Sequence, residues 1–86
     1  MEEETVDINE NRHRYHFTRE ATQKEMAQRF GVTLRTIGKY YPNRAMATAR
    51  DPPLAIGVKG TASSRAAALA YIRAVMENGP PAAGSG

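Results

Sequence analysis

The stretch GVTLRTIGKYYP, residues 31–42, decides the predicted fold because it carries the start and stop signals of a short helix. Gly31 is the residue type that ends a preceding helix in a left-handed conformation. Thr33 is then a candidate N-cap for a second helix. Pro42 ends that helix, since the residue before a proline is pushed out of the helical region. We therefore expect a helix that begins at Leu34 and stops before Pro42.

This predicted helix has an apolar side and a basic side. The apolar arc holds Leu34, Ile37, Tyr40 and Tyr41, and the opposite arc holds Arg35, Thr36 and Lys39. Gly38 costs such a helix about 1 kcal/mol relative to alanine. Glycine at this position either allows the helix to approach a partner closely or is simply tolerated in a short helix.

A first helix is predicted directly before this stretch. TQKE, residues 22–25, has the pattern of a capping box, in which Thr22 and Glu25 satisfy each other's main-chain amides. Met26, Ala27 and Phe30 follow at helical spacing on one face. We therefore expect two short helices separated by the turn at Gly31.

Two capped helices with a glycine turn between them resemble the helix-turn-helix DNA-binding motif, over about a quarter of the chain. Five positions fit its pattern: Ala27, Gly31, Val32, Ile37 and Tyr40. GVTLRTIGKYY is also similar to the corresponding stretch in regulators of the mercury-resistance type. An ordinary αα-hairpin with a solvated basic edge is the alternative interpretation of the same residues.

The resemblance implies that the second helix enters the major groove while the first crosses the phosphate backbone. Arg35 is then the best candidate for reading a base, since a bidentate arginine–guanine contact discriminates by about 1–3 kcal/mol. Arg44 lies in the following connection and is a candidate for a phosphate or minor-groove contact. The predicted DNA-binding residues are Gln23, Lys24, Thr33, Arg35, Thr36, Lys39 and Arg44.

The rest of the chain adds a helix and two ambiguous segments. RYHFT, residues 14–18, alternates as a strand does, although a helix is nearly as plausible. Residues 54–58 predict a short strand that could pair with it. Residues 63–78 predict a helix capped by Ser63 or Ser64 and ended by Gly79. The expected fold is mainly α: a helix-turn-helix core, a C-terminal helix and, if 14–18 is a strand, a short two-stranded β element.

We expect three regions along the chain. Residues 1–12 form an acidic leader, expected to be disordered, that could compete with DNA for the basic face. Residues 13–78 form the folded domain, and its last helix is expected to pack on the core or to form a homodimer. Residues 79–86 form a flexible tail.

Charge and composition favour a polyanionic partner. Five of the nine acidic residues lie in residues 1–10, which leaves 12 basic against four acidic residues in the remainder. The chain has no cysteine, no phosphate-binding glycine loop and no nucleophile signature, so we expect neither an enzyme nor a cofactor. No apolar run is long enough to span a membrane. A cytoplasmic, nucleoid-associated protein without a small-molecule effector is expected.

Histidine and aromatic residues offer two further interpretations. His13 and His16 have a spacing that could hold a metal, but a third ligand is missing, so a basic arm that touches phosphate is preferred. Their protonation below about pH 6.5 would then strengthen binding. The aromatic residues could stack on bases, but alternation favours a role in the core; they are Tyr15, Phe17, Tyr40 and Tyr41.

Together these features predict sequence-specific binding of double-stranded DNA by a small prokaryotic, phage or plasmid transcriptional regulator, such as a repressor. An architectural or recombination-accessory DNA-binding protein is one alternative. A protein–protein adaptor that keeps the helix-turn-helix shape without DNA contact is the other.

Overall fold

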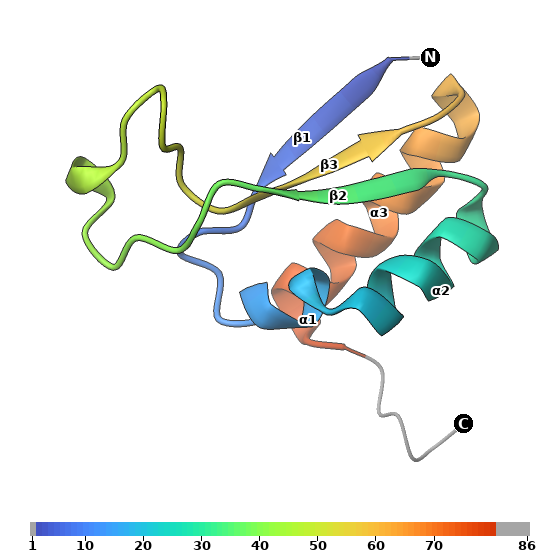
Figure 1. The fold of residues 1–86 in the computed structure, drawn as a ribbon. Coiled ribbons are helices and arrows are strands. Elements are labelled where there is room, and N and C mark those ends of the chain that lie inside the picture. Colours follow the sequence, from blue (N-terminus) through green and yellow to red (C-terminus); the bar gives the residue numbers. More distant parts are fainter. Residues whose placement is uncertain (1, 81–86) are drawn as a thin grey trace.

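The computed structural model describes residues 2–80, which form strands and helices in the order β-α-α-β-β-α (Figure 1). The strands are β1 (Glu3–Asp7), β2 (Thr33–Ile37) and β3 (Ala55–Lys59). The helices are α1 (Arg14–Thr18), α2 (Glu20–Phe30) and α3 (Ala62–Asn78), and a 3-10 turn, η1 (Arg44–Met46), lies between β2 and β3. The fold is therefore α/β with an antiparallel sheet, and the prediction of a mainly α fold is wrong.

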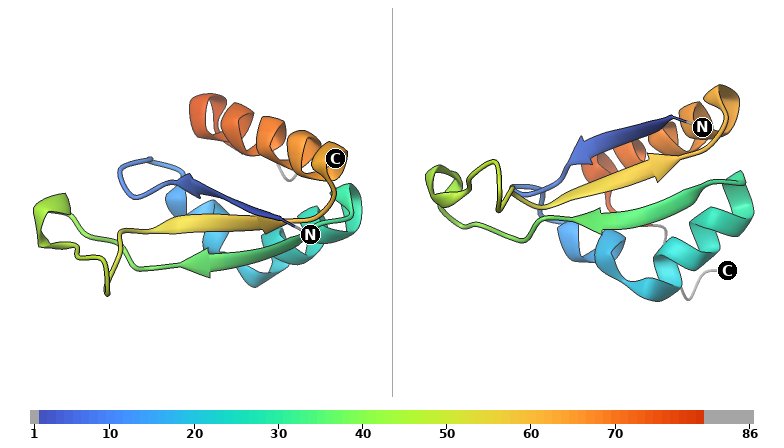
Figure 2. Two further views of the ribbon diagram at one scale, coloured as in Figure 1. Left: turned by 90° about the horizontal axis from the view of Figure 1, so that it is seen from above. Right: turned by 45° about the horizontal axis from the view of Figure 1, so that its top comes forward.

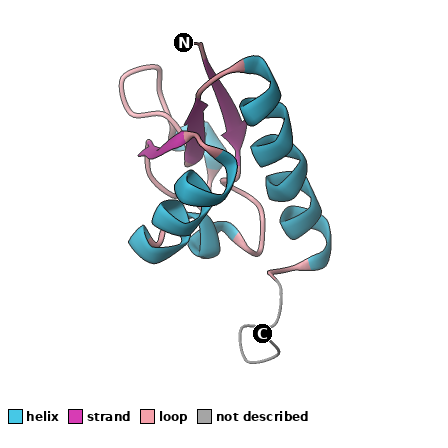
Figure 3. Ribbon diagram, turned by 90° about the vertical axis from the view of Figure 1, so that its right-hand side faces the viewer, coloured by secondary structure: helices cyan, strands magenta, loops and turns pink. Residues whose placement is uncertain are grey.

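The three strands form one sheet with β3 at its centre. β1 and β2 pair with β3 on either side, both antiparallel. The register places Val6 and Thr36 opposite Ile56, in one row of residues across the sheet. In the next row Arg35 lies opposite Gly57. Because successive side chains on a strand point to opposite faces, these two rows face opposite ways. The helices lie along one face only, which leaves the row of Gly57 on an open face (Figures 2 and 3).

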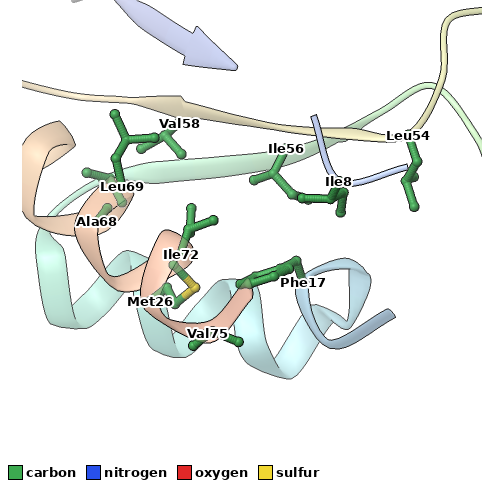
Figure 4. Packing of buried hydrophobic residues seen from close by; sticks show 11 residues of the cluster. Ile8, Phe17, Met26, Leu54, Ile56, Val58, Ala68, Leu69, Ile72 and Val75 are labelled. Carbon is green, nitrogen blue, oxygen red and sulfur yellow. The ribbon is translucent and has the colours of Figure 1, made fainter. Parts of the chain in front are cut away.

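The hydrophobic core lies between the sheet and the helices (Figure 4). Ile56 and Val58 of the central strand are 1% and 0% exposed. Opposite them lie Phe17 of α1, Met26 of α2, and Ala68, Leu69, Ile72 and Val75 of α3. The apolar arc of α3 is thus covered by the chain's own core. Because these residues are already buried, the apolar arc of α3 no longer gives a reason to expect a dimer through this helix. The homodimer stays a prediction.

Three sequence predictions are confirmed by this architecture. The predicted strand at 54–58 is β3, displaced by one residue, and the predicted helix at 63–78 is α3. The cap of α3 is Thr61, whose side-chain oxygen accepts from the Ser64 amide at 3.3 Å, rather than Ser63 or Ser64. Gly31 ends α2 with a φ of +68°, as the helix-ending glycine signal predicts.

The start of α2 differs from the predicted capping box. The helix begins at Glu20, and its N-cap is Arg19, which makes no side-chain cap hydrogen bond. Thr22 and Glu25 therefore lie inside the helix. Arg19 is also the residue that ends α1, so the two helices share one junction residue.

Residues 33–37 form strand β2, and the predicted recognition helix is wrong. Thr33, Thr36 and Ile37 are β-branched, which favours a strand when a partner is available, and β3 supplies that partner. Gly38 follows with a φ of +70°, a conformation that the interior of an α-helix excludes. A Cβ atom at Gly38 would clash with the carbonyl oxygens of Pro52 and Pro53. Glycine is therefore required for a sharp turn here and not for a helix that approaches DNA.

The structure decides one N-terminal alternative and corrects one expectation. Residues 14–18, for which strand and helix are both open from the sequence, form helix α1, and β3 pairs with β1 and β2. Residues 3–7 of the expected disordered leader form β1. Two carboxylates hold that strand in place: Glu3 pairs with Arg35, and Glu4 pairs with Arg65 at 2.9 Å. The expected flexible tail, residues 79–86, falls for the most part on residues 81–86, outside the described residues.

Candidate nucleic-acid interface

The predicted DNA-binding residues do not share one surface. Gln23 and Lys24 lie on α2, while Thr33, Arg35 and Thr36 lie on β2. Lys39 follows the turn after β2, and Arg44 lies in η1. Because β2 is a strand, Thr36 faces the helices whereas Thr33 and Arg35 belong to the open face of the sheet. The structure therefore divides this set among three places.

Gln23 and Thr36 are the only two of these residues within the described chain that the structure joins by a side-chain hydrogen bond. The Gln23 side-chain amide donates to the Thr36 hydroxyl at 2.9 Å and to the Phe17 carbonyl at 2.8 Å. These bonds tie α2 to α1 on one side and to β2 on the other. Gln23 thus connects both helices to the outer strand β2 by hydrogen bonds.

Arg35 is engaged within the chain on the open face of the sheet. Its Nε and Nη2 donate to the two carboxylate oxygens of Glu3 at 2.7 and 2.8 Å. The pair spans Gly57 of the central strand, where a Cβ atom would come within 2.7 Å of Glu3 Oε2. The hydrogen bond from Arg35 holds the pKa of Glu3 below its ordinary value. Thr33 lies next to this pair. Glu3, Arg35, Thr33 and Lys59 together line a shallow hollow.

Arg44 is also committed to acidic partners. Its guanidinium pairs with Asp7, and its Nη1 donates to Glu10 at 2.6 Å. The hydrogen bond from Arg44 is the main cause that lowers the pKa of Asp7. These contacts attach the β2–β3 connection to the end of β1 and to the segment that follows it. These ion pairs explain the presence of Arg44 at this position without a nucleic-acid contact.

Two basic side chains of the predicted set have no close carboxylate partner in the described part of the chain. Lys24 makes a long ion pair of 3.9 Å with Glu20, one helical turn away, and 76% of its side chain is exposed. The Lys39 ammonium lies 5.3 Å from the centre of the Tyr41 ring. Exposed pairs of this kind contribute little to stability, so both charges are available to an anion.

Sequence reasoning missed a cluster formed by Arg14, Tyr15 and Tyr40, where α1 meets the chain just beyond β2. The Arg14 guanidinium carbon lies 3.9 Å from the centre of the Tyr40 ring and 4.8 Å from that of Tyr15. The two rings meet edge to face, with centroids 6.3 Å apart. The signal in the sequence is RY at residues 14–15, a basic residue beside an aromatic one, in a segment that the sequence alone leaves open between strand and helix.

We define the α1–β2 edge as the surface along which α1, the α1–α2 junction and α2 border β2. β2 is an outer strand of the sheet, so on this side its main chain has no neighbouring strand among residues 2–80. The edge carries cationic, aromatic and amide groups together. Its members are Arg14, Tyr15, Arg19, Gln23, Thr36 and Tyr40.

The histidines do not form a metal site in the described part of the chain, where no three histidine or carboxylate side chains gather. His13 Nε2 accepts from Arg12 Nε at 3.1 Å. His16 Nε2 is buried without a partner, and burial lowers the pKa of this imidazole. The expected phosphate-touching arm therefore does not include a readily protonated His16. Residues 2–80 also contain no helix of the length and apolarity that crossing a membrane requires.

Comparison with known proteins identifies this arrangement. A model of the KH-domain family matches residues 2–81. An uncharacterized protein of Schizosaccharomyces pombe is 49% identical over 49 residues, which are 57% of this chain and 9% of that protein. The chain thus matches a small part of that much longer relative. No solved structure matches.

The match overturns the resemblance to helix-turn-helix regulators of the mercury-resistance type, and with it the expected repressor. The helix, glycine turn and apolar residue at 27–32 occur in both folds, but the following segment is a strand here. KH domains recognise nucleic acid, so the expectation of a nucleic-acid partner holds at that general level. The family model covers nearly the whole chain and agrees with a three-stranded sheet covered by three helices: the chain belongs to the KH-domain family.

Proposed function

We propose that this domain is a non-enzymatic module that binds single-stranded nucleic acid, with RNA as its natural ligand, along the α1–β2 edge. The observation that carries the proposal is the position of β2, an outer strand that lies directly beside α1 and α2. Unpaired bases expose hydrogen-bonding edges that a main chain and nearby amides can meet. Gln23 and Thr36 supply such polar groups in the middle of the edge.

A duplex fits this surface poorly. Reading the major groove needs a protruding helix or a two-stranded ribbon. Residues 33–37, which would have formed the helix, are a strand within a sheet. The Arg35 side chain, the expected base reader, points to the open face and is bound to Glu3. An extended single strand needs no such protrusion, because it can lie in the line between α1 and β2.

The phosphate contacts must differ from those of KH domains that clamp the backbone with a G-x-x-G loop. In this chain Arg19 alone joins α1 to α2, and no glycine lies there. G-x-x-G occurs at residues 57–60, but Gly57 lies inside β3 and Gly60 packs against Val32. We therefore assign the backbone contact to the Arg19 side chain and to the first amides of α2, which no side chain caps.

Fluorescence anisotropy with random-sequence 12-nucleotide RNA, the matching single-stranded DNA and a duplex tests this proposal. We expect both single strands to bind more tightly than the duplex. With about four phosphate contacts, log K should fall against log salt with a slope of roughly −3. Arg19→Ala should weaken binding and reduce that slope by about 0.7.

Arg73→Ala is the matched control, because Arg73 is exposed on α3 and is not part of the α1–β2 edge. It removes the same charge and should change the slope far less than Arg19→Ala. Equal affinity for duplex and single strands, or no binding at 50 mM salt, would contradict the proposal.

A further inference from the structure

We infer that Tyr15 is a stacking platform for one unpaired nucleobase, held in position by Arg14 and Tyr40. The inference rests on the proposed binding of single-stranded nucleic acid and assigns a base-binding position within it. Tyr15 would add a stacking contact to the main-chain and amide contacts proposed above.

The exposure of Tyr15 is the first observation. α1 carries two aromatic residues two positions apart, which a helix places on nearly opposite sides. Phe17 points into the core and is 1% exposed, whereas Tyr15 is 53% exposed. Folding thus buries one of the two aromatic residues and leaves the other exposed. An aromatic ring is a large apolar surface to leave in water, and its flat face suits a stacked ligand.

The support beneath Tyr15 is the second observation. Tyr40 packs against the core and meets the Tyr15 ring edge to face at an interplanar angle of 69°. Arg14 lies over both rings, and its Nη1 donates to the Asn11 carbonyl at 3.0 Å. The guanidinium is therefore anchored, and the two contacts restrict the rotation of Tyr15. A ring already fixed in place loses little entropy when a ligand stacks on it.

The charge beside the platform indicates the ligand. A cationic guanidinium next to the ring opposes a cationic ligand, such as a methylated lysine, that an aromatic cage would otherwise attract. It favours a base whose adjoining phosphates are negative. Arg19, at the junction where α1 ends, adds a second positive charge close to the same edge. A base within a single-stranded polyanion fits both the ring and the charges.

A second arginine–aromatic cluster in the chain provides a comparison. Arg29 lies 5.0 Å from the Phe30 ring centre and 5.1 Å from the Tyr71 ring centre. Both of these rings pack against the hydrophobic core and are partly buried. The Arg29 cluster therefore has a similar composition without an exposed aromatic residue. The exposure of Tyr15 is the feature that distinguishes the two.

The experiment measures a thermodynamic cycle between Tyr15 and a base. A 12-nucleotide RNA that the protein binds is prepared with one abasic site at each position in turn. Binding of the series to the wild type, Tyr15→Phe and Tyr15→Leu is measured by anisotropy. We expect one position at which loss of the base weakens wild-type and Tyr15→Phe binding by about 5- to 150-fold. Tyr15→Leu should bind the intact RNA with an affinity reduced by a similar factor, and removal of the base at that position should not reduce its affinity further.

A spectroscopic measurement reports stacking separately from affinity. 2-Aminopurine at the sensitive position should be quenched by the wild type and by Tyr15→Phe but not by Tyr15→Leu at saturation. Arg29→Ala is the control and should leave the quenching unchanged. Circular dichroism and thermal melting confirm that each variant is folded.

The outcomes separate the two proposals. If the wild type binds RNA but Tyr15→Leu binds equally well and responds to every abasic site as the wild type does, the platform is wrong while single-strand binding stands. If the wild type binds no single strand, both proposals fail.

Discussion

The side chain of Asn9 forms two hydrogen bonds with the main chain of Tyr41, which lies just beyond the turn at Gly38 that follows β2. Its Nδ2 donates to the Tyr41 carbonyl at 2.9 Å, and its Oδ1 accepts from the Tyr41 amide at 2.9 Å. The same oxygen accepts from the Leu54 amide at 3.3 Å, just before β3. Asn9 is 0% exposed. One buried amide thus holds both ends of the β2–β3 connection.

We predict that Asn9→Ala lowers the free energy of unfolding by about 2–4 kcal/mol, because it leaves buried main-chain groups of Tyr41 without partners. Urea denaturation of both proteins measures the change. Asn78→Ala, at the exposed end of α3, removes the same side chain and should change stability far less. A loss below 1 kcal/mol at Asn9 would show that water replaces the amide.

Two glycines with nearly the same backbone conformation provide a second prediction. Gly31 and Gly38 have φ values of +68° and +70°. A Cβ at Gly31 would meet only Ser64 Oγ at 3.8 Å, whereas one at Gly38 would clash with main-chain oxygens. Gly31→Ala should therefore cost about 1–2 kcal/mol from conformation alone. Gly38→Ala should cost about 2–5 kcal/mol because crowding is added. Equal costs in thermal melting would disprove the proposed turn at Gly38.

The Arg35–Glu3 pair predicts a pH effect that is separate from nucleic-acid binding. Because the folded protein lowers the pKa of Glu3 below 4.5, the pair stabilises the fold above that pH. This contribution is lost as the pH falls through the lower folded-state value. Arg35→Ala should raise the pKa of Glu3, observed by NMR titration of its side chain. The same variant should leave RNA affinity nearly unchanged, and a loss as large as that of Arg19→Ala would place the interface on the open face.

His16 predicts a second pH dependence, at higher pH. Burial lowers the pKa of its imidazole below 6.5, and the charge of Arg19 acts in the same direction, opposed by Glu25 and reinforced by His13. The unfolded chain therefore takes up a proton before the folded chain does, and stability should decline as the pH falls below about 6.5. His16→Gln should remove part of this decline between pH 7.5 and 5.5 in urea denaturation. An unchanged pH dependence would show that His16 is not responsible.

The sequence predicted what depends on local signals. The glycine that ends α2, the helix α3 and the strand β3 each follow from residues within one turn or one alternating run. The segment 33–37 could not be assigned in this way. Its apolar spacing suits a helix, and only the partner strand more than 20 residues away, where Val58 lies opposite Leu34, makes it a strand.

The candidate site was hidden by the same ambiguity. Alternation at Tyr15 and Phe17 suggested that both rings belong to the core. In a helix the same spacing separates them, so the core assignment is confirmed for Phe17 and wrong for Tyr15. Arg35 seemed a base reader because Glu3, its partner, lies in a segment that local composition marks as disordered. Each of these contacts is set by tertiary structure.

The attachment of the β2–β3 connection by Asn9 also has an evolutionary consequence. Because the ends of this connection are held by one side chain, the segment between them contributes little to the core, and its tip projects from the sheet with Met46 67% exposed (Figure 1). Doubling the length of a flexible loop costs only about 0.6 kcal/mol. Insertions at this tip are therefore nearly neutral for folding, and it is the position at which related domains can diverge in length and acquire contacts of their own.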